Sequence, residues 1–201
     1  LPSEKNPNSK IIKPYIKLIS NTTSLFTYLI VIFEGMFIVG SFSYTGSFIA
    51  RIYHYNNLYI GLIMTGFGIM SVIGGRMSGK ITRRIGQRKV LSLGLVSAAF
   101  ADIMIYFFGT NLLILILAVA LLGVGFILTH STLLTRATAF AEKARGSAMS
   151  LVAFCFMGGG GFGTAIGGRI IILYGINTLF IIYGSLLILT LLVSHMLIKD
   201  I

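Results

Sequence analysis

The sequence predicts an all-α polytopic membrane protein with six transmembrane helices, and three observations lead to this prediction. Of the 201 residues, 56% are hydrophobic and only 10% are charged, with a mean hydropathy of +0.93, whereas a soluble domain would carry roughly 25% charged residues. The apolar residues fall into six runs of about 20 residues, the length that crosses a hydrocarbon core about 30 Å thick. The Lys and Arg residues are concentrated in alternate connections between these runs.

The first three runs form one expected triplet of spans. The first, Leu25–Ala50, follows a polar and basic stretch, so we divide the chain into a cytoplasmic linker at 1–24 and a six-helix bundle at 25–201. The second, Leu58–Gly75, contains no charged residue. The third, Val90–Phe108, follows a long basic connection that we expect to be a loop.

The last three runs form the second triplet. Leu112–Leu134 is strongly apolar, Ser147–Ile170 carries a run of glycines, and Thr178–Ile198 closes the bundle. The two triplets begin on opposite faces of the membrane. We therefore expect a 3+3 inverted repeat, which is a pattern of secondary transporters.

The basic residues predict the orientation of the chain. If the N-terminus is cytoplasmic, 14 of the 16 Lys and Arg residues lie on the cytoplasmic side, and only Arg51 and Arg169 lie outside. Positive charge is concentrated in cytoplasmic connections of membrane proteins. We therefore expect both termini in the cytoplasm. The net charge of +11 follows from this distribution and does not indicate nucleic acid binding, which would need a basic patch on a soluble surface.

The connection between the second and third runs carries a specific pattern. It resembles the signature loop of the major facilitator superfamily, Gly-x-x-x-Asp-Arg-x-Gly-Arg-Arg. The matching positions are Gly79, Arg84, Gly86 and Arg88. Arg83 stands where the family usually has Asp, and Gln87 where it usually has a base. The resemblance implies a gating loop made of Gly79, Arg83, Arg84, Gly86 and Arg88. A plain basic loop is the alternative interpretation.

Glycines dominate the fifth run. Gly159, Gly163 and Gly167 recur every four residues, a spacing that lets membrane helices approach closely. The stretch resembles the antiporter motif Gly-x-x-x-Gly-Pro-x-x-Gly-Gly of the same superfamily, with Thr164 in place of Pro. Generic tight packing is the alternative.

A third stretch, Arg145–Leu151, resembles the start of helix eleven in drug and sugar efflux members. Together the resemblances imply the C-terminal half of a major facilitator transporter of the efflux antiporter type. They also imply that the first, second, fourth and fifth spans line the transport cavity.

Glu34 is the main candidate for a functional acid, because an ionisable group inside a membrane span is costly and is a functional hypothesis by default. At about 100° per residue, Thr27, Glu34, Ser41 and Thr45 share one face of the first span. We expect this stripe to carry a coupling proton or to contact the substrate. A buried Glu satisfied by a neighbouring hydroxyl is the alternative.

Asp102, in the third span, is a second candidate for the same role, and Arg169 could pair with it as a structural strut. His130 and His195 are expected at cytoplasmic helix ends, where solvent is available, and His54 lies outside. We therefore expect no histidine cluster.

No enzymatic motif is visible. The sequence has no Gly-x-Ser-x-Gly or His-Glu-x-x-His, and no metal-ligand spacing. We expect no catalytic residue, cofactor or metal.

The expected function is proton-coupled transport of a small organic solute by alternating access in the plasma membrane. The expected partners are the lipid bilayer, the solute, protons and an N-terminal six-helix half, in the same longer chain or in a separate subunit. Two alternatives remain: a self-assembling half-size transporter, and a membrane assembly or sensor subunit that transports nothing.

Overall fold

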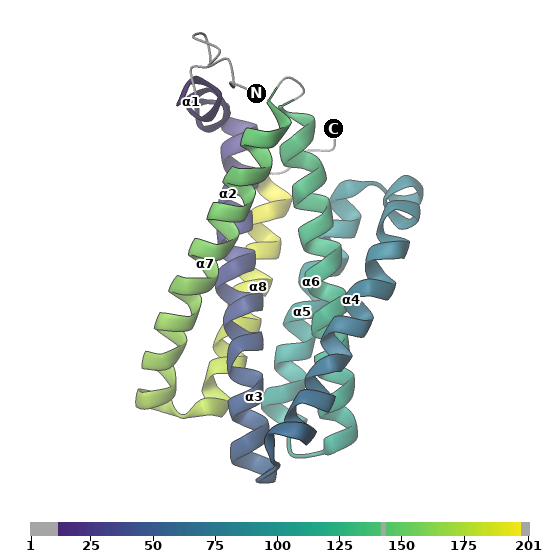
Figure 1. Ribbon diagram of the computed structural model, residues 1–201, viewed down its shortest axis with the longest axis vertical. Coiled ribbons are helices and arrows are strands. Elements are labelled where there is room, and N and C mark those ends of the chain that lie inside the picture. Colours follow the sequence, from purple (N-terminus) through teal and green to yellow (C-terminus); the bar gives the residue numbers. More distant parts are fainter. Residues whose placement is uncertain (1–11, 142–143, 198–201) are drawn as a thin grey trace, which may run out of the picture.

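The computed structural model describes residues 12–141 and 144–197, which form a bundle of long helices (Figure 1). Six helical segments in this part of the chain are long and apolar enough to cross a membrane, which confirms the predicted fold class. The first span covers residues 22–53 and consists of α2 (Thr22–Glu34), the π-helix η1 (Gly35–Val39) and α3 (Gly40–Tyr53). The other spans are α4 (Asn57–Ile85), α5 (Gln87–Phe108), α6 (Leu112–Ala139), α7 (Arg145–Tyr174) and α8 (Ile176–Leu197).

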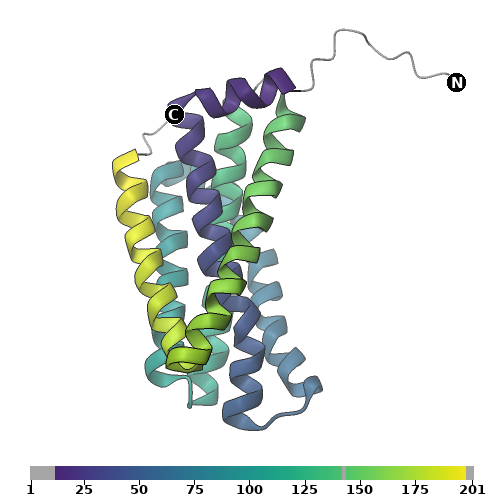
Figure 2. The same cartoon turned by 90° about the vertical axis from the view of Figure 1, so that its left-hand side faces the viewer.

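A short helix, α1 (Ile12–Ser20), precedes the first span and lies across the end of the bundle (Figures 1 and 2). It falls within the stretch that we expected to be a linker. Its direction differs from that of the six spans, which run roughly parallel and antiparallel to one another (Figure 2). The start of α2 and the end of α8 lie at this same end (Figure 1).

Asparagine and glycine set the helix ends. Asn21, Asn56 and Asn111 accept hydrogen bonds from the first free backbone N–H groups of α2, α4 and α6, which a helix cannot satisfy internally. Gly86 and Gly175 have φ of 84° and 85° and end α4 and α7. These positive values favour residues without a Cβ.

The long loop expected between the second and third spans is not observed. The helix α4 continues to Ile85, and α5 begins at Gln87, so Gly86 alone separates them. The reason is that the stretch contains no Pro, and its Lys, Arg, Met and Ile residues are compatible with a helix. At 1.5 Å per residue, a 29-residue α4 exceeds the hydrocarbon thickness of about 30 Å by more than two turns.

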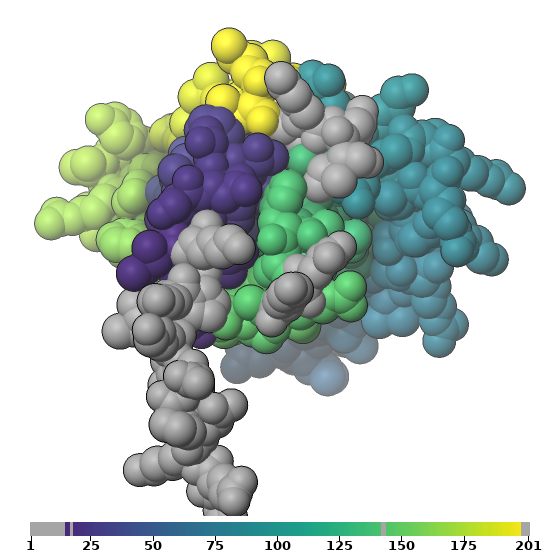
Figure 3. Space-filling view, turned by 90° about the horizontal axis from the view of Figure 1, so that it is seen from above, coloured from purple at the N-terminus to yellow at the C-terminus, as the bar shows by residue number. Residues whose placement is uncertain are grey.

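Small residues allow the helices to pack closely. At Gly125 on α6, a Cβ would lie 2.6 Å from the backbone nitrogen of Ala98 on α5. Helix α5 packs mainly against α6 and α8, while α7 packs against the first span. The spans α4 and α7 have the smallest buried share and lie at opposite margins of the bundle (Figure 3).

Candidate functional site

Glu34 is the last residue of α2, at the point where the first span passes into the π-helix. Its side chain is fully buried, and its Oε2 lies 3.2 Å from Nδ1 of His130 on α6. Oε1 is also buried and makes no hydrogen bond to any described residue. A carboxyl group and an imidazole at this separation can share and transfer a proton. Short π-helical segments frequently occur at functional sites.

The expectation that His130 lies at a helix end is wrong. Because α6 continues to Ala139, beyond the expected end at Leu134, His130 lies more than two turns inside the helix. Its side chain is 24% exposed, whereas the side chain of Glu34 is 0% exposed. His130 therefore joins the buried carboxyl group to the surface of the bundle.

Aromatic rings extend from His130 over four spans. His130 packs against Phe126 and Phe156, with ring centroids 5.4 Å and 4.7 Å away. Phe126 stacks on Phe67 at 5.5 Å, and Phe67 packs on Phe42 at 4.2 Å. We call these five residues the aromatic wall; all five are partly exposed.

The members of the aromatic wall come from α3, α4, α6 and α7. These elements belong to the first, second, fourth and fifth spans, the four that were expected to line a cavity. The four phenylalanines could not be singled out from the sequence, because phenylalanine occurs in every one of the six apolar runs.

The rest of the polar stripe faces the bundle interior. Thr27, Ser41 and Thr45 are all fully buried. The hydroxyl groups of Thr27 and Thr45 donate to backbone carbonyls one turn earlier in their own helices, at 3.1 Å and 3.0 Å. These two threonines are therefore satisfied within the first span.

Ser41 connects the stripe to the second buried acid. Its hydroxyl group donates to Oδ1 of Asp102 on α5. Asp102 is fully buried, and its Oδ2 has no partner among the described residues. Arg169 is exposed, and within the described residues it forms no ion pair with Asp102. The structure thus gives Asp102 a serine partner in place of the arginine strut.

The α7 glycines lie against the first span. A Cβ at Gly163 would lie 2.7 Å from Cα of Met36, and one at Gly159 would lie 3.0 Å from the carbonyl carbon of Ile32. A Cβ at Gly167 would meet the ring of Tyr44 at 2.6 Å. The backbones of these two spans are therefore in direct contact where the glycines occur, beside the π-helix.

The residues expected in a gating loop occupy helix ends. Gly79, Arg83 and Arg84 belong to α4, and both arginines are exposed. Arg88, at the start of α5, donates from Nη2 to the backbone oxygen of His195 on α8 at 2.5 Å. Arg136, which sequence reasoning did not single out, is fully buried on α6 and donates to Oε1 of Gln87 at 3.3 Å. These contacts tie three helix ends together.

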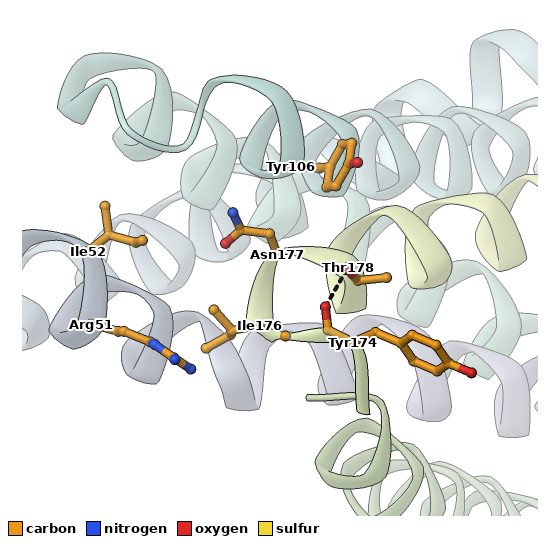
Figure 4. A pocket seen from close by; sticks show the side chains of 8 residues that line it. Arg51, Ile52, Tyr106, Tyr174, Ile176, Asn177 and Thr178 are labelled. Carbon is orange, nitrogen blue, oxygen red and sulfur yellow. Dashed lines mark hydrogen bonds between the residues drawn. The ribbon is translucent and has the colours of Figure 1, made fainter. Parts of the chain in front are cut away.

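A separate cavity of about 460 Å³ lies at the other end of the bundle. The end of α3, helix α5 and the turn between α7 and α8 surround it, with Arg51, Tyr106 and Asn177 in its lining (Figure 4). Its lining includes no residue of the polar stripe or of the expected gating loop, and none of Gly159, Gly163 and Gly167. Among the described residues, no group of three or more His, Cys, Asp or Glu could hold a metal ion.

The family model for the Major Facilitator Superfamily matches residues 24–200, nearly the whole chain. No curated protein matches.

Proposed function

Because the chain belongs to the major facilitator superfamily, a family of solute transporters, we propose that it moves a small organic solute across a membrane by alternating access, in exchange for protons. The bundle corresponds to half of the family's fold. The solute would be a drug-like compound or a sugar, exported from the cytoplasm across the plasma membrane. In this proposal one end of the bundle faces the cytoplasm, namely the end at which α1 lies and α8 terminates.

The observation that carries the proposal is the contact between Glu34 and His130. A carboxyl group buried in an apolar bundle is expensive when charged, unless it is paired. Loading a proton onto Glu34 removes this cost. His130, which is partly exposed and contacts the carboxyl group, would pass the proton between the surface of the bundle and Glu34. Proton binding and release would thereby change the charge beside the π-helix, where the first span contacts α7.

The aromatic wall supports solute binding at the same level of the bundle. Partly exposed rings offer flat apolar surface to a drug-like compound and a stacking face to a sugar. Because the wall includes His130, a bound solute would lie within reach of the group that exchanges protons. If the solute and the proton compete for binding beside His130, movement of one across the membrane would be exchanged for movement of the other.

A second six-helix half would complete the cavity. The spans α4 and α7 present large exposed apolar side chains, among them Leu62, Ile69, Phe154 and Met157. Some of these would face lipid and some the second half, encoded in the same longer chain or in a separate subunit. Rocking of the two halves would expose the aromatic wall to each side in turn.

The test is transport in vesicles under an imposed pH gradient, with and without an upstream six-helix segment, against a panel of small solutes. We expect Glu34→Gln to lower gradient-driven accumulation by at least about tenfold, since the proton carrier is lost. Ser185→Ala is the control, because Ser185 is exposed on α8 and bonds only to its own helix. Transport by the chain alone would favour a self-assembling half-size transporter. No transport in any combination would favour an assembly or sensor subunit.

A further inference from the structure

We propose that α1 is an interfacial anchor that binds the anionic phospholipid headgroups of the membrane leaflet at the basic end of the bundle. That this leaflet is the cytoplasmic one rests on the orientation given in the proposed function. The binding itself does not, because it depends only on the position and the surface of α1.

The position of α1 places it at the membrane boundary. Helix α2 begins at Thr22, which is also the first residue of the first span. Asn21 alone separates α1 from α2, and its side chain caps α2 through Thr23 and Ser24. Since α1 lies across the end of the bundle (Figures 1 and 2), at the start of this 32-residue helical segment, its length runs roughly parallel to the membrane surface on that side.

One side of α1 is attached to the protein. Leu18 is 5% exposed and belongs to the hydrophobic core. The hydroxyl group of Tyr15 lies 2.9 Å from Oγ of Ser150 near the start of α7. Helix α1 is therefore held by both α2 and α7, and its other sides face away from them.

The next side is apolar and uncovered. Ile16 and Ile19 are 58% and 47% exposed, and residues three apart lie on the same face of a helix. Large apolar side chains at this level fit the boundary between headgroups and acyl chains, where amphipathic helices bury their apolar face. The same residues would be unfavourable in water.

Charge selects anionic lipid as the occupant. The first 20 residues carry four Lys and one Glu, and Lys13 and Lys17 belong to α1, one turn apart. Anionic lipids attract such basic segments next to a span. The matching end of another membrane half would carry an excess of positive charge as well, so it would repel α1 rather than attract it.

The absence of Trp from the sequence permits a direct test. The full chain, with Ile16→Trp or Ile19→Trp, is placed in vesicles of zwitterionic lipid with increasing fractions of phosphatidylglycerol. Quenching of Trp emission is measured with lipids brominated near the headgroup or deep in the acyl chain. Leu189→Trp, exposed in the middle of α8, is the control that reports insertion of the bundle.

We expect the α1 reporters to be quenched most by shallow bromines and the Leu189 reporter by deep ones. Quenching of the α1 reporters should increase with the anionic fraction. The added change Lys13→Gln with Lys17→Gln should raise severalfold the anionic fraction needed for half-maximal quenching.

Three results would overturn the anchor while the Leu189 reporter still shows an inserted bundle. The first is quenching of the α1 reporters by aqueous acrylamide and not by lipid. The second is lipid quenching that does not depend on anionic lipid. The third is protection from both quenchers only when an upstream half is present, which would assign this face to that half. None of them depends on transport, so failure of the anchor is distinguishable from failure of the proposed function.

Discussion

Replacing Gly163 by Ala tests the backbone contact between α7 and the first span. The new Cβ would lie 2.6 Å from the carbonyl carbon of Met36 and 2.7 Å from its Cα, whereas ordinary contact begins at 3.4 Å. The shortfall from ordinary contact is 3.4 − 2.6 = 0.8 Å at the carbonyl carbon, and the carbonyl oxygen of Met36 lies nearer still, so the two spans would have to separate by more than 0.8 Å. Overpacking of this kind costs about 1–3 kcal/mol. The obstructing atoms are backbone atoms, so no rotamer change can relieve the clash.

The assay is thermal unfolding in detergent, followed by circular dichroism. A cost of about 2 kcal/mol in a chain of this size should lower the apparent Tm by roughly 4–8 °C. Gly158→Ala is the matched control, because a Cβ there meets nothing within 4 Å, and Ala should leave Tm unchanged or raise it. Equal Tm values for Gly163→Ala and the parent chain would refute the close contact, as would equal losses for the two variants.

Two further changes are measured in the same unfolding assay. Ser41→Ala removes the hydroxyl group that donates to Asp102 and should lower the free energy of unfolding by about 1–3 kcal/mol. The control Ser43→Ala, at an exposed position bonded to its own helix, should lower it little. Similar losses of stability for both variants would show that the buried pair contributes nothing. Gly86→Ala forces a Cβ onto a residue with φ 84° and ψ 158° and should lower the free energy of unfolding by about 1–3 kcal/mol. The control Gly79→Ala, where a Cβ meets nothing within 4 Å, should be neutral or stabilising. A Tm of Gly86→Ala equal to that of the parent chain would contradict a backbone conformation at Gly86 that disfavours a Cβ.

The number of spans could be predicted from sequence because apolar runs report directly on the medium that surrounds a helix. All six expected runs lie within the six observed spans, apart from Ile198, which lies outside the described residues. The helix ends were less predictable. An apolar run ends where a helix leaves the membrane, whereas the helix itself can continue. Helix α4 continues with polar residues until Gly86 ends it.

The candidate site was only half predictable. An acid in an apolar run is visible in the sequence, so Glu34 could be identified as a candidate. Its partner His130 lies 96 residues away along the chain, and the packing of α6 against the first span brings the two together. Ser41 was identified as part of the polar stripe, but its bond to Asp102 could not be predicted, because side-chain pairing between helices depends on their rotation and register.

The central claim is that Glu34 carries the coupled proton, and comparing exchange with accumulation tests it most directly. In vesicles that contain the assembled transporter, Glu34→Gln should keep solute-for-solute exchange, since Gln imitates the neutral carboxyl group. The same variant should lose accumulation driven by a pH gradient. Gradient-driven accumulation at the parent level in Glu34→Gln would contradict the account.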